Sequence, residues 1–178
     1  MARFASLGFR RVVLSSLVFA LAACAGFDGR NLEPGESTLP EVIASMGEPA
    51  MRWKDPDGRE QLAYPRGPAA TQTFMVFTDP DGRLERIEPV LDMAHFARVT
   101  PRKSNVESVI RLLGPVTNNN RAYFKERDEL ALSWLYCDAW SKQSYFDVLF
   151  DATTGIVRTT FHRLNLVGSL GVQPGCGH

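Results

Sequence analysis

Histidine and cysteine are scarce in this sequence, with three of each among 178 residues. The histidines stand alone, without a His-x-x-x-His pair or a glutamate at metal-ligand spacing, and no Cys-x-x-Cys pair occurs. His95 and His162 are therefore expected to be surface or packing residues. A Gly-x-Ser-x-Gly turn and a glycine-rich phosphate loop are also missing. The sequence predicts a protein that is not an enzyme and uses no metal and no cofactor. Because catalytic triads are recognised by geometry, an enzyme without a sequence motif stays an alternative.

An excess of positive charge is missing as well. The chain has 20 Lys and Arg and 20 Asp and Glu. Arg3, Arg10 and Arg11 are the only charged residues before Cys24, so residues 24–178 keep 17 basic and 20 acidic side chains, a net charge of −3. This weakly acidic chain gives no electrostatic reason to expect binding to nucleic acid. After Cys24, no apolar run is long enough to cross a bilayer.

The first residues have the pattern of a bacterial export signal. The arginines are followed by an apolar run, Val12–Ala23, which is short for a span of about 30 Å but typical of a signal peptide. Leu21-Ala22-Ala23-Cys24 then resembles the bacterial lipobox, in which the chain is cut before a cysteine that becomes lipidated. A short membrane anchor or a buried helix is the alternative interpretation.

The lipobox implies that Cys24 is acylated and holds the protein on the periplasmic face of a membrane. Several acyl chains, each stabilised by about 0.8 kcal/mol per buried methylene, make such an anchor effectively permanent. Ala25 follows the cysteine. In lipoproteins of the enterobacterial kind an aspartate at this position signals retention in the inner membrane, so the resemblance favours the outer membrane.

The other two cysteines are Cys137 and Cys176. An even number of cysteines in an oxidising compartment suggests a disulfide. This bond would close a loop of about forty residues and stabilise the chain by about 3 kcal/mol. The alternative is that Cys137, which lies in an apolar run, is a buried thiol and that Cys176 is free.

The chain repeats itself with an offset of 67 residues. Leu32-Glu33-Pro34 matches Val99-Thr100-Pro101, and Ser37 matches Ser104. The apolar positions and the glycine of the first copy fall on apolar positions and a glycine of the second: Leu39, Val42, Ile43, Met46 and Gly47 on Val106, Val109, Ile110, Leu113 and Gly114. Farther along the offset becomes 72 or 73, where Phe74, Asp79 and Gly82 match Phe146, Asp151 and Gly155. An ordered series of this kind indicates a duplication.

Each copy begins with a short helix. Ser37 and Ser104 are expected to be the N-caps. The apolar residues, spaced three and four positions apart, line one face of each helix. Gly47 and Gly114 end the helices, and the prolines that follow prevent them from resuming. A further helix is expected at Val90–Val99, with Leu91, Phe96 and Val99 packed on a sheet.

After each helix the pattern changes to that of strands. In the first copy, two Asp-Pro-Asp-Gly segments supply the backbone angles of tight hairpin turns. A calcium loop is a poor alternative, because the further oxygen ligands and the distal glutamate are missing. The expected strands are 50–54, 59–64, 71–78, 83–88, 121–125, 129–136, 145–151 and 156–162. The fold class is therefore α+β, a tandem repeat of a small unit with one or two helices on a three- to four-stranded antiparallel sheet.

These features divide the chain into five segments. They are a lipoprotein signal peptide at 1–23, a tether at 24–33, a first domain at 34–89, a second domain at 90–165, and a Gly/Pro-rich C-terminal tail at 166–178.

The two domains resemble the SmpA/OmlA (BamE-like) family of outer-membrane lipoproteins. The likeness is carried by the lipobox and by two similar sets of segments, Leu32–Ser37, Val42–Pro49 and Phe74–Phe77 in the first copy and Phe96–Pro101, Val109–Pro115 and Phe146–Asp151 in the second. The resemblance implies a small α+β fold, a lipid anchor and a link to the outer-membrane β-barrel assembly machine. Two such domains in tandem are similar to the arrangement of β-lactamase inhibitor proteins, which belong to the same superfamily. Because the matching helix pattern is structural, it transfers no binding site.

Aromatic residues concentrate in or beside the expected strands. Most must pack between helix and sheet, but Trp134 and Tyr136 share one strand face and Trp140 lies in the following loop. These three are the candidate partner-binding residues. The sequence thus predicts an outer-membrane-anchored module that binds a protein partner during envelope assembly. The alternative is a periplasmic inhibitor or sensor that binds an enzyme such as a β-lactamase or a cell-wall hydrolase.

Overall fold

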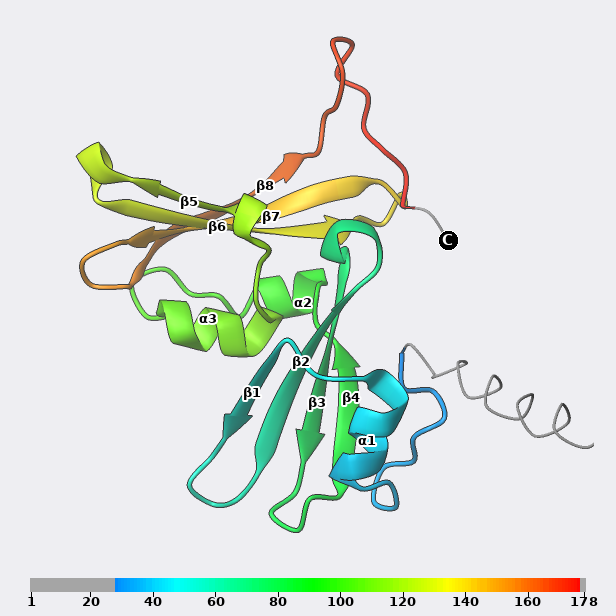
Figure 1. Cartoon of the computed structure of the whole chain (residues 1–178). Coiled ribbons are helices and arrows are strands. Elements are labelled where there is room, and N and C mark those ends of the chain that lie inside the picture. Colours follow the sequence, from blue (N-terminus) through cyan, green and yellow to red (C-terminus); the bar gives the residue numbers. More distant parts are fainter. Residues whose placement is uncertain (1–27, 177–178) are drawn as a thin grey trace, which may run out of the picture.

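The computed structural model describes residues 28–176 (Figure 1). The expected signal peptide and the expected lipidation site Cys24 lie outside the described residues. Within the described part, no helix is both long enough and apolar enough to cross a membrane.

The described chain forms two four-stranded antiparallel sheets, each a simple meander of consecutive strands. The first sheet has the order β1-β2-β3-β4 and the second the order β5-β6-β7-β8. Every predicted strand is present, with ends that lie within two residues of those expected, so the mixed α+β prediction is confirmed. The strands are β1 (Met51–Lys54), β2 (Glu60–Arg66), β3 (Gln72–Thr78), β4 (Leu84–Pro89), β5 (Arg121–Phe124), β6 (Glu129–Cys137), β7 (Gln143–Asp151) and β8 (Val157–Leu164).

The Asp-Pro-Asp-Gly segments form the predicted hairpin turns. Gly58 and Gly82 have φ angles of 93° and 76°. The Gly82 N–H donates to the Asp79 carbonyl at 3.0 Å, and the Asp79 N–H donates to Arg83 across the hairpin at 2.9 Å. Three 3-10 turns lie in longer connections: η1 (Pro68–Ala70), η2 (Asn118–Asn120) and η3 (Lys125–Arg127).

Two eight-residue helices occupy matching places, α1 (Leu39–Met46) before the first sheet and α3 (Val106–Leu113) before the second. The prediction of serine N-caps was wrong by one residue: the N-caps are Thr38 and Asn105. The serine hydroxyls instead close the preceding turns, where each accepts from the backbone N–H four residues earlier at 2.9 Å. A serine in this position satisfies a turn donor and leaves helix capping to the next polar residue.

The two copies make the same backbone hydrogen bonds at each helix entry. In both, the helix start is fixed to the last strand and to the turn before that strand. The equivalent bonds, first copy then second, are Gly35 N to Leu84 O (2.7 Å) and Arg102 N to Val157 O (2.8 Å), Leu39 N to Gly82 O (2.8 Å) and Val106 N to Gly155 O (3.0 Å), and Leu84 N to Ser37 O (2.8 Å) and Val157 N to Ser104 O (2.9 Å). The offsets are 67 for the helix side and 73 for the strand side, as in the sequence match.

The helix expected at Val90–Val99 is shorter than predicted. Only α2 (Met93–Phe96) is helical, capped by the Asp92 carboxylate, which accepts from the His95 N–H at 2.8 Å. Its expected packing is present, because Phe96 and Val99 are buried in the core of the second unit and Leu91 is packed against that core.

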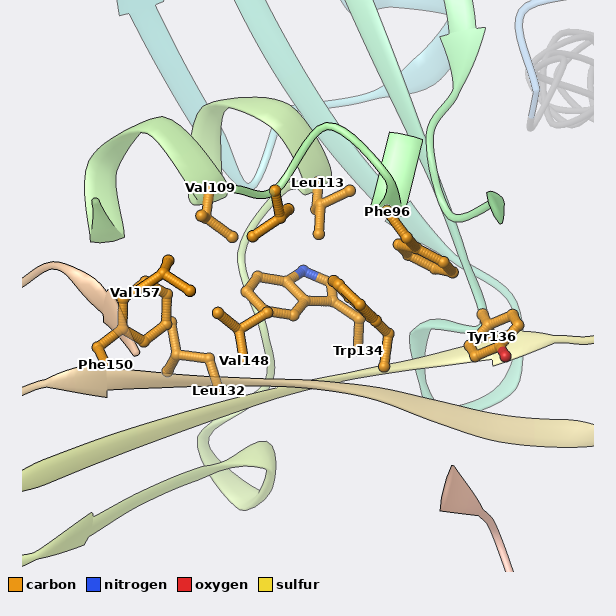
Figure 2. Packing of buried hydrophobic residues seen from close by; sticks show 11 residues of the cluster. Phe96, Val109, Leu113, Leu132, Trp134, Tyr136, Val148, Phe150 and Val157 are labelled. Carbon is orange, nitrogen blue, oxygen red and sulfur yellow. The ribbon is translucent and has the colours of Figure 1, made fainter. Parts of the chain in front are cut away.

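The core of the second unit lies between its sheet and the helices α2 and α3 (Figure 2). Leu132, Trp134 and Tyr136 of β6 point toward the helices, together with Phe146, Val148 and Phe150 of β7. The first unit is built in the same way, with Val42 and Met46 of α1 packed on β2, β3 and β4.

Helix α3 also contacts the other sheet, and α2 and α3 lie between the two sheets (Figure 1). The Gln61 side-chain amide of β2 donates to the Arg111 carbonyl, and the Arg111 guanidinium donates to Asp55 at 2.7 Å. A Cβ atom added at Gly114 would lie 2.6 Å from Cγ2 of Thr73 in β3. The carbonyl of Gly114 accepts from the Trp134 indole at 2.9 Å, so this glycine lies between both sheets.

Candidate functional site

Two of the three aromatic candidates are core residues, so the prediction of a surface role for Trp134 and Tyr136 was wrong. They are only 2% and 6% exposed. The Tyr136 hydroxyl is within hydrogen-bonding distance of Nδ1 of His162 (3.0 Å). Both residues do share one face of β6, as expected, but this face packs on α2 and α3 (Figure 2). The alternation of a strand defines the two faces, and only the tertiary contacts decide which of them is buried.

Trp140 is the aromatic residue that remains on the surface, with 85% of its side chain exposed. It lies in the turn between β6 and β7, where the Trp140 N–H donates to the Asp138 carboxylate at 2.9 Å. This turn has the geometry of the Asp-Pro-Asp-Gly turns: Asp79 accepts from the Asp81 N–H in the same way at 3.0 Å. Trp140 therefore stands where the other turn has a solvated aspartate. A tryptophan at such a position costs solubility and is unexplained by packing.

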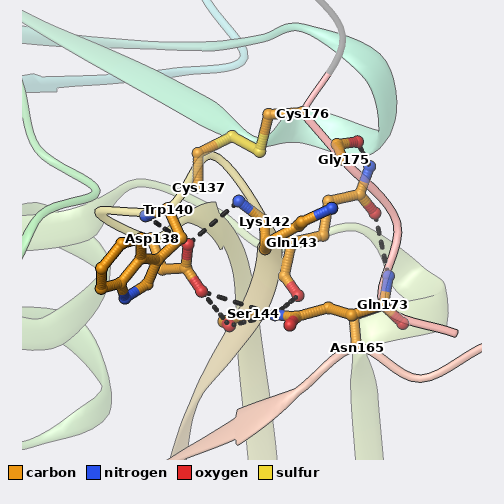
Figure 3. Close-up of a disulfide and its surroundings, with 10 residues drawn as sticks. All are labelled: Cys137, Asp138, Trp140, Lys142, Gln143, Ser144, Asn165, Gln173, Gly175 and Cys176. Carbon is orange, nitrogen blue, oxygen red and sulfur yellow. Dashed lines mark hydrogen bonds between the residues drawn. A yellow bond between two sulfur atoms is a disulfide. The ribbon is translucent and has the colours of Figure 1, made fainter. Parts of the chain in front are cut away.

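A disulfide between Cys137 and Cys176 holds this turn, and it is the pair that the sequence suggested (Figure 3). The two Cα atoms are 6.1 Å apart and the bond joins residues 39 positions apart in the chain. The Cys176 N–H donates to the Ser141 carbonyl at 2.9 Å, and the Gln143 N–H donates to the Pro174 carbonyl at 2.9 Å. The end of the tail thus runs alongside the start of β7 as an additional, covalently fixed segment.

The Asp138 carboxylate organises the turn from the inside (Figure 3). It accepts from the Lys142 N–H at 3.0 Å, from the Ser144 hydroxyl at 3.3 Å and from the Gln173 amide of the tail at 3.4 Å. These bonds, first that from Lys142, lower the pKa of Asp138 below its ordinary value. Asp138 is therefore ionised at neutral pH, and Trp140 is presented by a rigid turn.

A groove of about 610 Å³ lies beside Trp140, lined by residues 91–94 before and in α2 and by residues 136–140. Met93, 60% exposed, forms one wall with an adaptable thioether side chain. The charged groups in the lining are Asp92 and Asp138. Burial alone would raise the pKa of Asp92, but the hydrogen bonds from the backbone and ring of His95 lower it overall. The groove is thus apolar with two carboxylates at neutral pH.

The groove itself was not predicted from the sequence. Leu91 was expected only to pack on the sheet, and Met93 was not singled out. One sequence signal indicates the turn that carries Trp140: Asp138-Ala139-Trp140-Ser141 has an aspartate at the same place as the other hairpin turns. In the structure Ser141 adopts a positive φ of 54°, as glycine does in those turns.

No cluster of three or more histidine, cysteine, aspartate or glutamate residues that could hold a metal ion occurs within residues 28–176. Comparison with protein-family models, curated proteins and solved structures gives no match to the chain.

Proposed function

We propose that this protein is an outer-membrane lipoprotein, anchored through Cys24, that acts as a non-enzymatic protein-interaction module in envelope assembly. Its binding site is the groove beside α2 together with Trp140. The observation that carries the proposal is an 85% exposed tryptophan on a turn that is fixed by a disulfide and by a buttressing carboxylate.

A rigid exposed tryptophan is suited to binding. Tryptophan is enriched among the residues that supply most of the energy of protein interfaces. Holding it in one conformation before binding reduces the entropy lost on association. The disulfide and the Gln173 contact provide this restraint at Trp140, and the neighbouring Met93 can adapt to the shape of a partner.

The chemistry of the groove indicates the kind of partner segment that fits. Its lining of Leu91, Met93, Ala94 and Ala139 accepts apolar side chains. Asp92 and Asp138, both ionised at neutral pH, favour a partner with lysine or arginine beside those apolar side chains. The partner is thus a protein segment with one or more apolar anchors and a basic flank. The likeness to the SmpA/OmlA family supports placing this partner within the β-barrel assembly machine.

The test is recovery of partners from detergent-solubilised membranes with the wild-type protein and two variants. Trp140→Ala removes the exposed ring, while Tyr123→Ala removes another exposed aromatic residue (60% exposed) from β5 as a control. We expect Trp140→Ala to lower the recovery of the specific partner at least about tenfold and Tyr123→Ala to leave it unchanged.

Equal recovery of the partner with Trp140→Ala and Tyr123→Ala would contradict the proposed binding site at Trp140. If no recovered protein belongs to the β-barrel assembly machine, the proposed link to that machine is contradicted, but the groove stays the binding site. Acylation is tested separately: labelled palmitate should be incorporated into the wild-type chain and not into Cys24→Ser.

A further inference from the structure

The C-terminal tail is unusual in its side chains. Residues 165–176 contain no Asp, Glu, Lys or Arg, whereas charged residues make up 22% of the whole chain. Four of the residues are large aliphatic side chains that lie largely in solvent: Leu166, Val167, Leu170 and Val172. Leu170 is the most exposed of them at 89%. Aliphatic side chains gathered in this way on a small projecting element indicate a surface that is covered when the protein functions.

These residues form a short hairpin. The Val167 N–H donates to the Val172 carbonyl at 2.9 Å, and the Val172 N–H donates back to Val167 at 3.0 Å. The Gly171 N–H closes the tip onto the Gly168 carbonyl at 3.2 Å. These bonds pair some of the backbone groups within the hairpin. Its outward-facing backbone groups need water or lipid headgroups, so only a shallow insertion into a bilayer fits it.

The base of the hairpin is fixed at both ends, and the hairpin projects from the second sheet (Figure 1). On one side Asn165 follows β8 directly and its side-chain amide donates to Gln143 at 2.9 Å. On the other side the Gln173 amide donates to the Gln143 carbonyl at 2.9 Å, and Cys176 is held by the disulfide (Figure 3). The fold thus presents an apolar tip on a firm base.

We propose that this hairpin inserts its aliphatic side chains at the boundary between the headgroups and the acyl chains of a lipid bilayer, and gives the protein a membrane contact besides Cys24. A lipid surface fits the tip better than a protein does. Protein interfaces draw their energy mainly from tryptophan, tyrosine and arginine, with leucine and valine under-represented. The tip offers only aliphatic side chains and glycine turns, with Ser169 as its one polar side chain. Burial of aliphatic groups in acyl chains needs no directional partner.

A second membrane contact would fix the orientation of the protein. A single acyl anchor at Cys24 does not by itself define how the two units are oriented to the bilayer. A hairpin that inserts as well would hold the second unit in a defined orientation to the bilayer, and the two contacts together bind far more tightly than either alone. The hairpin proposal stands apart from the groove, because neither Met93 nor Trp140 takes part in it.

Binding to lipid vesicles tests the hairpin directly. The chain from residue 24 onward carrying Cys24→Ser, which cannot be acylated, is mixed with phosphatidylcholine vesicles and the bound fraction is measured by flotation. Leu170→Asp puts a charge at the tip and should lower the vesicle partition coefficient at least about tenfold. Tyr123→Asp, at an exposed aromatic residue of β5 outside both the tail and the groove, is the matched control and should bind vesicles like the parent chain.

The outcomes separate this proposal from the groove. Loss of vesicle binding in Leu170→Asp alone supports the hairpin, whereas loss of protein recovery in Trp140→Ala alone concerns only the groove. Binding that needs anionic phosphatidylglycerol vesicles and disappears in salt would overturn the insertion, since acyl burial is independent of headgroup charge. The insertion would also be overturned if the parent chain did not bind vesicles, or if it formed dimers that dissociate in Leu170→Asp.

Discussion

The two sheets have the same topology. They differ in the polarity of the face that points away from their own helices. In the first sheet, Ala63 and Met75 pair across β2 and β3 on the face away from α1, and both are fully buried where the second unit covers them. In the second sheet the equivalent pair is Ser133 and Asp147, which faces away from α2 and α3. One face carries an alanine and a methionine and the other a hydroxyl and a carboxylate.

This difference follows the contacts of each pair, because the first pair is covered by the second unit and the second pair is satisfied within its own sheet. The Ser133 hydroxyl donates to Asp147, and the Arg163 guanidinium of β8 donates to Asp147 at 2.5 Å. The carboxylate is only 4% exposed, yet it is satisfied within its own sheet. The outer face therefore needs no further layer, as with the polar outer face of a terminal repeat in a repeat protein.

Exchanging the side chains at Met75 and Asp147 tests the difference between the two faces. Met75→Asp would bury a carboxylate beneath the second unit, without the arginine and serine that Asp147 has. We expect a loss of at least about 4 kcal/mol of unfolding free energy, because an unpaired buried charge is costly. Denaturant unfolding followed by circular dichroism measures it.

Asp147→Met is the reciprocal control. It removes a carboxylate whose partner Arg163 is half exposed and should cost about 1 kcal/mol or less. Equal losses in the two variants would contradict the difference between Met75, covered by the second unit, and Asp147, satisfied within its own sheet.

The disulfide gives the second unit a restraint that the first unit lacks. Replacing Cys137 and Cys176 together by alanine removes the bond without leaving a free thiol. We expect a loss of about 2–4 kcal/mol, since the bond closes a long loop in the unfolded chain. Hydrogen exchange of the individual strands is the informative measurement: protection should fall in β7, β8 and the tail before it falls in β2 and β3. A uniform loss over both sheets would show that the restraint acts on the whole stack.

The glycines that end α1 and α3 provide a matched pair. Gly47 and Gly114 have nearly equal φ angles of 80° and 84° and ψ angles of −171° and 174°. Essentially only glycine occupies this region, so alanine at either site incurs about 1–3 kcal/mol of backbone strain. A Cβ at Gly47 meets nothing within 4 Å, whereas at Gly114 it meets Thr73 of the other unit. Gly114→Ala should therefore cost about 1–3 kcal/mol more than Gly47→Ala. Thermal unfolding of the two variants compares them, and equal melting temperatures would place α3 away from the first sheet.

The smallest expected effect is a pH dependence that belongs to the second unit alone. Burial lowers the pKa of His162, while residues 28–89 contain no histidine. Below the ordinary histidine pKa of about 6.5, the unfolded chain binds more protons than the folded chain. Stability is thus complete above that pH and falls as the pH falls through the window below it. Melting temperatures between pH 7.5 and 5.5 should show this decline, and His162→Phe should reduce it. A wild-type melting temperature that rises as the solution is acidified would contradict the lowered pKa of His162.

Most of the fold could be predicted from local patterns. Strand alternation, the turns with Asp-Pro-Asp-Gly and the paired helix ends depend on neighbouring residues, and they place all eight strands. The N-caps were missed by one residue because Ser37 and Thr38 can both accept from a backbone N–H, and the choice depends on the turn before the helix.

The site could be predicted only in part. Trp140 follows from its place in a turn, and the disulfide from the cysteine count. The burial of Trp134 depends on which face of β6 meets α3, and the groove depends on α2 lying beside a turn more than forty residues away in the sequence. Such contacts between distant segments leave no local pattern.

The most direct test of the binding site is site-specific photocrosslinking in intact membranes, with a photoreactive amino acid at position 140 and, as control, at position 123 of β5. We expect a discrete crosslinked adduct to one envelope protein from position 140 and none from position 123. Met93→Asp should abolish the adduct from position 140. The same adduct from both positions, or no adduct from position 140, would contradict this binding site.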